Sequence, residues 1–165
     1  MKNKNSGIAI VPGSFDPITN GHLDIVKRAA NTYDKVYVAV MINPNKNYMF
    51  TIEERKKIVQ AALSDIKGVD VIASDGMLWE IAKELCATAI VKGVRNQKDI
   101  EYEREMAEYN SAHYPAAETV FLQADATLMT VSSTLAREMI DKSQSLSGIV
   151  PEKAIAEINK IIYNR

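Results

Sequence analysis

The sequence has 165 residues, of which 47% are apolar and 25% are charged, and its formal net charge is −1. This length and apolar content suit one globular domain, residues 1–165, with a sizeable core. The near-zero charge argues against nucleic-acid or membrane-surface binding, so any phosphate binding must come from local cationic groups.

Cysteine content and the first residues bear on the compartment. The single cysteine, Cys86, excludes an internal disulfide framework, and the apolar helical pattern around it predicts a buried structural thiol. No apolar run reaches the length of a membrane span. Residues 1–6 are polar and include two lysines, unlike a secretory signal. We therefore expect a cytoplasmic protein.

The first predicted elements are a strand at residues 8–11 and a helix that ends near Tyr33, joined by the segment 12–22. Gly13 and Gly21 would let the backbone approach a ligand closely, and the unpaired N–H groups of the first helical turn attract anions. His22 falls in that turn, where the helix dipole favours a neutral, hydrogen-bond-donating imidazole. Asp16, before a proline, is predicted to form a local Asx-turn.

The residues of this segment also bear on other interpretations of it. It lacks the lysine of a Walker A loop and the G-x-G-x-x-G of a dinucleotide fingerprint. It could also be a tight turn that binds nothing, in which His22 only caps the helix. The features suited to phosphate favour an anion site.

Four further strands, each followed by a helix, are predicted along the rest of the chain. The strands fall at 36–42, 69–73, 87–91 and 118–122, and the helices at 52–67, 78–85, 97–113, 131–142 and 151–163. The almost unbroken apolar run at 36–42 is typical of a strand buried on both faces. The alternation predicts an α/β fold, with a doubly wound, Rossmann-like, five-stranded parallel sheet and flanking helices. On the helix at 97–113, His113 shares a stripe with Tyr102, Met106 and Tyr109 and is expected to pack partly buried.

Residues suited to phosphate binding follow the predicted strands. In doubly wound sheets, ligands bind outside the carboxyl ends of the strands. Each residue could separately be a solvated surface group, but all fall at that one edge: Ser14, His22, Lys46, Lys92, Arg95, Ser132, Ser133 and Thr134. The sequence therefore predicts a site for several phosphates.

The segment GSFDPITNGH, residues 13–22, resembles the signature of the nucleotidylyltransferase superfamily, and VSSTLAR, residues 131–137, resembles its second motif. The stretches 43–46, 49–55 and 99–103 resemble more closely the bacterial phosphopantetheine adenylyltransferase family, over nearly the whole chain. The resemblance implies transfer of AMP from ATP to 4′-phosphopantetheine, giving dephospho-coenzyme A and pyrophosphate. Mg²⁺ would enter with ATP, and the sequence contains no carboxylate cluster suited to a dedicated metal site.

The resemblance also implies roles for individual residues. The implied catalytic residues are His22, Lys46 and Arg95. The implied phosphopantetheine-binding residues are Ser14, Lys46, Leu78 and Lys92, where Lys92 stands in place of the family's usual arginine. The implied ATP-binding residues are Ser14, Phe15, His22, Gly93, Val94, Arg95, Glu103, Leu128, Met129, Thr130, Val131, Ser132, Ser133 and Thr134.

The implied chemistry asks little of the protein beyond positioning. The acceptor phosphate is already anionic, so it can attack in line without a general base or covalent intermediate. Two alternatives remain: transfer from ATP or CTP to another phosphorylated acceptor, and a nucleotide-sensing module without turnover. The resemblance further implies a homo-oligomer, hexameric in related bacterial enzymes, with coenzyme A as a feedback ligand.

Overall fold

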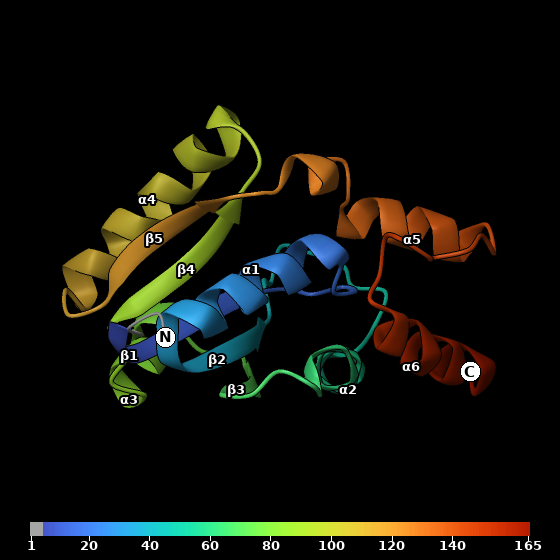
Figure 1. The fold of residues 1–165 in the computed structure, drawn as a ribbon, viewed down its shortest axis with the longest axis horizontal. Helices are drawn as coiled ribbons and strands as arrows, with labels where there is room; N and C mark the ends of the chain where they lie inside the picture. The colour runs from blue at the N-terminus through green and yellow to red at the C-terminus, as the bar shows by residue number, and fades with distance from the viewer. Residues whose placement is uncertain (1–4) are drawn as a thin grey trace.

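A computed structural model describes residues 5–165 and contains one parallel sheet at its centre (Figure 1). Within those residues five strands have the spatial order β3-β2-β1-β4-β5. They are β1 (Asn5–Gly13), β2 (Tyr33–Met41), β3 (Val69–Ser74), β4 (Ala89–Val94) and β5 (Glu118–Gln123). Each neighbouring pair is parallel. The strand order reverses between β1 and β4, which is where ligands bind in sheets of this kind.

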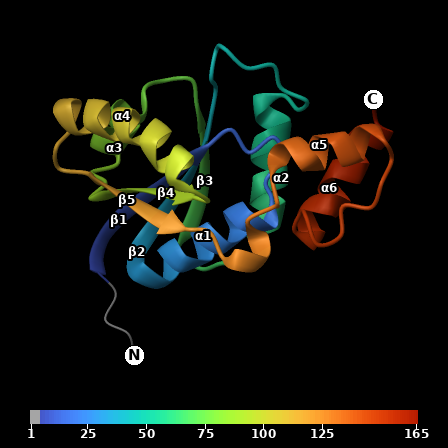
Figure 2. The ribbon, with the colours of Figure 1, turned by 90° about the horizontal axis from the view of Figure 1, so that it is seen from above.

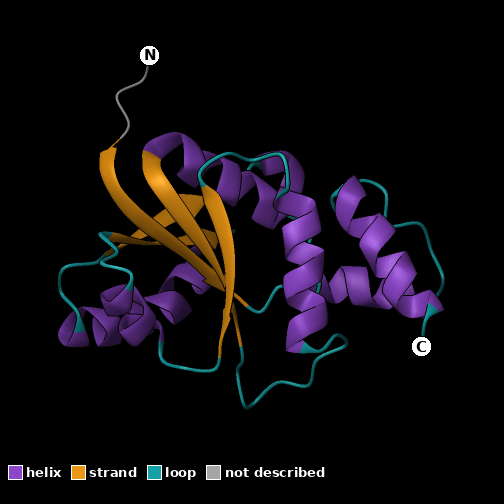
Figure 3. Cartoon of the chain, turned by 90° about the horizontal axis from the view of Figure 1, so that it is seen from below, coloured by secondary structure: helices purple, strands orange, loops and turns teal. Residues whose placement is uncertain are grey.

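Helices cover both faces of the sheet, as the predicted doubly wound fold requires (Figure 3). One face packs against α1 (Asn20–Thr32) and α2 (Ile52–Leu63), and the core on that side continues beyond the sheet into α5 (Ser133–Asp141) and α6 (Glu152–Tyr163). The other packs against α3 (Leu78–Glu84), with α4 (Gln97–His113) lying against α3, β4 and β5. A short 3₁₀ turn, η1 (Ala126–Leu128), leads into α5, and α6 packs on α2 beyond the sheet (Figure 2).

Alternation along the central strands supplies the two cores. Val36, Val38 and Val40 of β2 point toward α1 and α2, while Ala39, between them, joins the core under α3. All four side chains are fully buried. The strand is therefore covered on both faces, which confirms the expectation drawn from its unbroken apolar run.

Several element boundaries differ from the sequence prediction: β1 is longer than residues 8–11, and α2 ends at Leu63 rather than near residue 67. The strand predicted at 87–91 is β4 and continues to Val94, because Lys92, Gly93 and Val94 pair with β5. Lys92 therefore lies within the strand rather than after it. The first helix ends at Thr32, and Tyr33 begins β2 directly.

Two burial predictions are wrong. Cys86 is exposed, with φ of +52°, because α3 has ended and the chain is turning so that Ala87 enters the core. The stripe on α4 faces outward: Tyr102 is 70% exposed, and His113 is exposed, although its ring stacks on Trp79 at 5.0 Å. Only the opposite side of α4 meets the sheet, so helical periodicity alone misassigned this face. In the part of the chain that the structure describes, no helix combines the length and apolar character needed to cross a bilayer.

Candidate active site

The candidate site lies at the carboxyl edge of the sheet. Gly13 at the end of β1 is in register with Val40 of β2, so the loops that leave these two strands start side by side. On the other side of β1, Ala9 and Ile10 pair with Ala89 and Ile90 of β4. The loop after β1 therefore starts between β2 and β4, the neighbours of β1 in the sheet.

His22 is held by the cap of α1. The backbone N–H of Thr19 donates to Nδ1 of His22 at 3.0 Å, while the Thr19 hydroxyl accepts from the His22 backbone N–H at 3.4 Å. A backbone N–H can only donate, so Nδ1 must be unprotonated and Nε2 carries the proton. Capping and ligand binding are thus compatible roles, with Nε2–H left as a donor.

The charge state of His22 agrees with that tautomer. Its pKa is lowered from 6.5 to about 4, chiefly by burial and to a lesser degree by the positive charges of Lys92 and Arg95. The lowered pKa supports the neutral ring expected from the sequence, and burial and the neighbouring cations account for it. β4 packs against α1, which brings the end of β4 close to the helix that carries His22. Phe15 packs edge-on to the imidazole, with ring centres 5.0 Å apart.

The lysine loop, residues 42–51, is tied to the loop after β1. The Asp16 carboxylate, only 2% exposed, accepts hydrogen bonds from the backbone N–H groups of Met49 at 2.9 Å and Phe50 at 3.0 Å. The predicted local Asx-turn is therefore wrong, because these donors come from a distant segment. Lys46 is exposed on this loop, and its backbone N–H donates to Asn43.

Tyr48 supplies a second link between the two loops. Its hydroxyl lies 3.4 Å from the Ser14 hydroxyl and accepts from the backbone N–H of Asn43 at 2.6 Å. Ser14 and the segment that carries Lys46 are consequently joined at one edge of the site.

Arg55 on α2 is not among the residues predicted for the site. It is 1% exposed, and its Nη1 donates to the carbonyls of Ser14 at 2.7 Å and Met41 at 2.9 Å. Its guanidinium also stacks on the Tyr48 ring, 3.9 Å from the ring centre. Arg55 thus connects the ends of β1 and β2. One feature of the sequence could have indicated its burial: Arg55 lies on the same helical face as the apolar residues Ile52 and Val59.

The second motif contacts the first loop directly. Ser132 caps α5, accepting from the Leu135 N–H at 3.1 Å, and the Ser133 hydroxyl donates to the Pro17 carbonyl at 2.8 Å. Arg137 donates to the Asp16 carbonyl at 2.8 Å, and its guanidinium lies 3.9 Å from the Asp16 carboxylate. Arg137, which had no assigned role, therefore supports the loop that carries Asp16.

The side chains at the end of β4 are engaged in ion pairs. Lys92 Nζ lies 3.3 Å from the Glu103 carboxylate, and Arg95 Nε lies 3.2 Å from that of Asp99. The Asp99 carboxylate also accepts the backbone N–H of Arg95 at 3.0 Å. Gly93 lies against α1, where an added Cβ would come within 2.9 Å of Ile25. A glycine is needed there for β4 to approach the helix.

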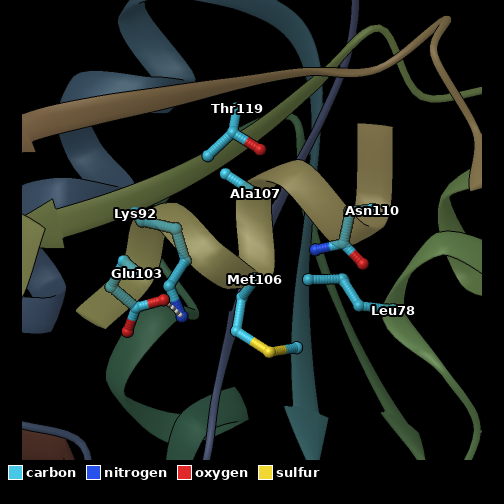
Figure 4. A pocket seen from close by; sticks show the side chains of 7 residues that line it. All are labelled: Leu78, Lys92, Glu103, Met106, Ala107, Asn110 and Thr119. Carbon is cyan, nitrogen blue, oxygen red and sulfur yellow. Dashed lines mark ion pairs between the residues drawn. The ribbon is translucent and has the colours of Figure 1, made fainter. Parts of the chain in front are cut away.

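A pocket of about 70 Å³ opens beside this ion pair (Figure 4). Its lining comes from α3, β4, α4 and β5: Leu78, Lys92, Glu103, Met106, Ala107, Asn110 and Thr119. Leu78 and Lys92, both implied for the acceptor, thus share one cavity with Glu103, which was implied for ATP. The cavity is smaller than a typical ligand pocket, so it can hold only part of a substrate.

The remaining predicted ATP-binding residues differ in exposure. Phe15 and Val131 have buried side chains, so they can offer a ligand little beyond their backbones. Met129 and Thr130 are exposed between β5 and α5, and Thr134 is exposed in the first turn of α5. Among residues 5–165, no three histidine, cysteine, aspartate or glutamate side chains are grouped to hold a metal ion.

Comparisons with known proteins agree with this geometry. The model of the cytidylyltransferase-like family matches residues 10–139. A phosphopantetheine adenylyltransferase from Alkaliphilus oremlandii is 45% identical over 158 residues, covering 96% of this chain and 98% of the relative. Proteins of the same name from Clostridium tetani and Streptococcus pyogenes are 40% and 41% identical, over 96% and 93% of this chain and 99% and 95% of their own. The chain therefore belongs to the phosphopantetheine adenylyltransferases of the cytidylyltransferase-like family.

Proposed function

We propose that the protein transfers AMP from ATP to 4′-phosphopantetheine, forming dephospho-coenzyme A and pyrophosphate. The observation that carries the proposal is the state of His22: a neutral imidazole, bound at Nδ1 and free to donate from Nε2, close to two cations at a sheet edge. Relatives nearly equal in length carry the name of this activity.

The two substrates are both polyanions, and their mutual repulsion is the main obstacle to reaction. Lys46 would contact the acceptor phosphate beside Ser14, with Leu78 along the pantetheine arm and Lys92 on the acceptor side. The hydrogen bonds that join the loops of Ser14 and Lys46 support this assignment. The acceptor phosphate would then attack the α-phosphorus of ATP in line, which makes positioning the protein's principal task.

On the ATP side, His22 would donate Nε2–H to the phosphates as negative charge moves toward the leaving pyrophosphate. One preorganised donor of this kind is worth on the order of 3 kcal/mol in the transition state, or roughly a hundredfold in rate. Arg95, with the backbone near Gly93 and Val94 and the segment 128–134, would complete the nucleotide contacts. Lys92 and Glu103 pair across the small pocket, so Glu103 would also orient the acceptor-side ammonium.

Further parts of the proposal concern cofactor, assembly and location. Mg²⁺ would arrive on the ATP phosphates and reduce their charge, held mostly by the phosphates and water. We also propose a homohexamer, feedback by coenzyme A and a cytoplasmic location. The exposed Tyr102, Met106 and Tyr109 on α4 support burial against another copy.

The test is pyrophosphate release with ATP and 4′-phosphopantetheine, comparing wild type with His22→Ala. We expect the variant to lose turnover by about a hundredfold or more while still binding ATP. His113→Ala, at the only other histidine, is the matched control and should keep the wild-type rate. Thermal melting checks that each variant is folded.

The same assay separates the alternatives. Pyrophosphate release only with another phosphorylated acceptor, or with CTP, would favour a different transferase. No release with any acceptor, despite nucleotide binding, would favour a sensing module. Turnover unaffected by His22→Ala would contradict the role of the imidazole.

A further inference from the structure

Arg165, two residues beyond the end of α6, reaches back to the lysine loop. Its Nη2 donates to the Met49 carbonyl at 2.9 Å and to the Glu54 carboxylate at 2.8 Å. Its guanidinium lies 5.1 Å from the centre of the Phe50 ring. One side chain therefore contacts three residues at the junction between the lysine loop and α2.

The same junction is held from its other side by Asp16. The Asp16 carboxylate binds the N–H groups of Met49 and Phe50, whereas Arg165 binds the Met49 carbonyl. The N–H groups of Met49 and Phe50 and the Met49 carbonyl are therefore all hydrogen-bonded. Met49 is only three residues from Lys46, so the position of this segment limits where the Lys46 ammonium can reach.

Glu54 connects the contact to the start of α2. Its carboxylate accepts the Thr51 N–H at 2.9 Å, while the Thr51 hydroxyl accepts the Glu54 N–H at 3.2 Å. Burial raises the pKa of Glu54, but the hydrogen bonds from Thr51 and Arg165 outweigh burial, so its pKa is lowered overall. Arg165 therefore binds an ionised carboxylate that is already fixed at the helix N-terminus.

We propose that Arg165 is a positioning residue that sets the lysine loop for the acceptor phosphate. This inference rests on the proposed function, in which Lys46 contacts that phosphate. Arg165 acts through the Met49 backbone and touches no reacting atom. Removing it leaves one edge of the junction free, so Lys46 spends less time in the productive position and the acceptor is used less well.

The packing of α6 does not depend on this contact. Ala154 and Ile158 bury α6 in the main core, whereas the Arg165 side chain is 45% exposed. Its removal should shift the melting temperature by about 2 °C or less. General destabilisation would therefore not explain a variant in which kcat/KM falls for the acceptor alone.

The test compares Arg165→Met, which keeps most of the stem, with Arg165→Lys, which keeps the charge. Lys160→Met, at an exposed cation within α6, is the matched control. ATP and 4′-phosphopantetheine are varied separately. We expect Arg165→Met to lower kcat/KM for the acceptor about three- to tenfold with KM for ATP unchanged. Arg165→Lys should recover part of the loss, and the control should match wild type.

A readout without turnover separates this proposal from the function on which it rests. Hydrogen exchange at the Met49 and Phe50 amides should be faster in Arg165→Met than in wild type and in the control. Unchanged exchange, or equal losses for ATP and acceptor, would overturn the positioning role. If wild type releases no pyrophosphate, the proposed function fails, and faster exchange would still support the mechanical link to the loop.

Discussion

The protonation of His22 offers a quantitative test of the site. Its pKa is about 4 in the folded protein, against 6.5 for an ordinary histidine. As pH falls below 6.5, the unfolded chain takes up a proton that the folded protein refuses. The contribution of His22 to stability is therefore full above pH 6.5, declines as pH falls toward 4, and changes no further below that. The difference of about 2.5 pH units corresponds to at most roughly 3 kcal/mol, less any screening because the ring is partly accessible.

The assay is urea unfolding of wild type and His22→Asn between pH 7.5 and 4. Contributions of the carboxylates are common to both proteins, so the difference in unfolding free energy isolates the imidazole. We expect wild type to lose about 2–3 kcal/mol more than the variant across this interval. In parallel, NMR follows the two histidine ring signals against pH, and the variant assigns the signal of His22.

A His22 signal that titrates at pH 6 or above, with equal pH slopes for both proteins, would refute the reasoning. It would mean that Nδ1 does not accept the Thr19 N–H and that the ring is more hydrated than its packing indicates. The donor role of Nε2 would then need a different basis.

Two further predictions concern stability. Asp16→Ala should destabilise the fold by about 2–5 kcal/mol in urea unfolding, because the buried Phe50 N–H and the partly buried Met49 N–H lose their acceptor. Asp16→Asn should cost less because one oxygen remains, and equal losses would contradict this account. Gly93→Ala should cost about 1–3 kcal/mol, because the new methyl would lie 2.9 Å from Ile25. Combining it with Ile25→Ala should cost less than the sum of the single changes, and strict additivity would show that the clash is absent.

Part of the site could be predicted because its signals are local. The strand-turn-helix pattern placed His22 in the first turn of α1, and Thr51 with Glu54 marked the start of α2, as the structure confirms. Alternating strands and helices predicted a parallel sheet, and the parallel sheet brings the strand ends to one edge. Each of these inferences depends only on residues close together in sequence.

The tertiary structure alone decided how that edge is held together. Asp16 binds amides more than thirty residues away, Arg55 bridges two strand ends, and Arg137 reaches the first loop from α5. Tertiary contacts also decided that Cys86 and the stripe on α4 face solvent. Periodicity shows which residues share a face, and capping shows where a helix begins. Neither shows which distant donor will meet a buried acceptor, because that partner is selected only when the elements pack.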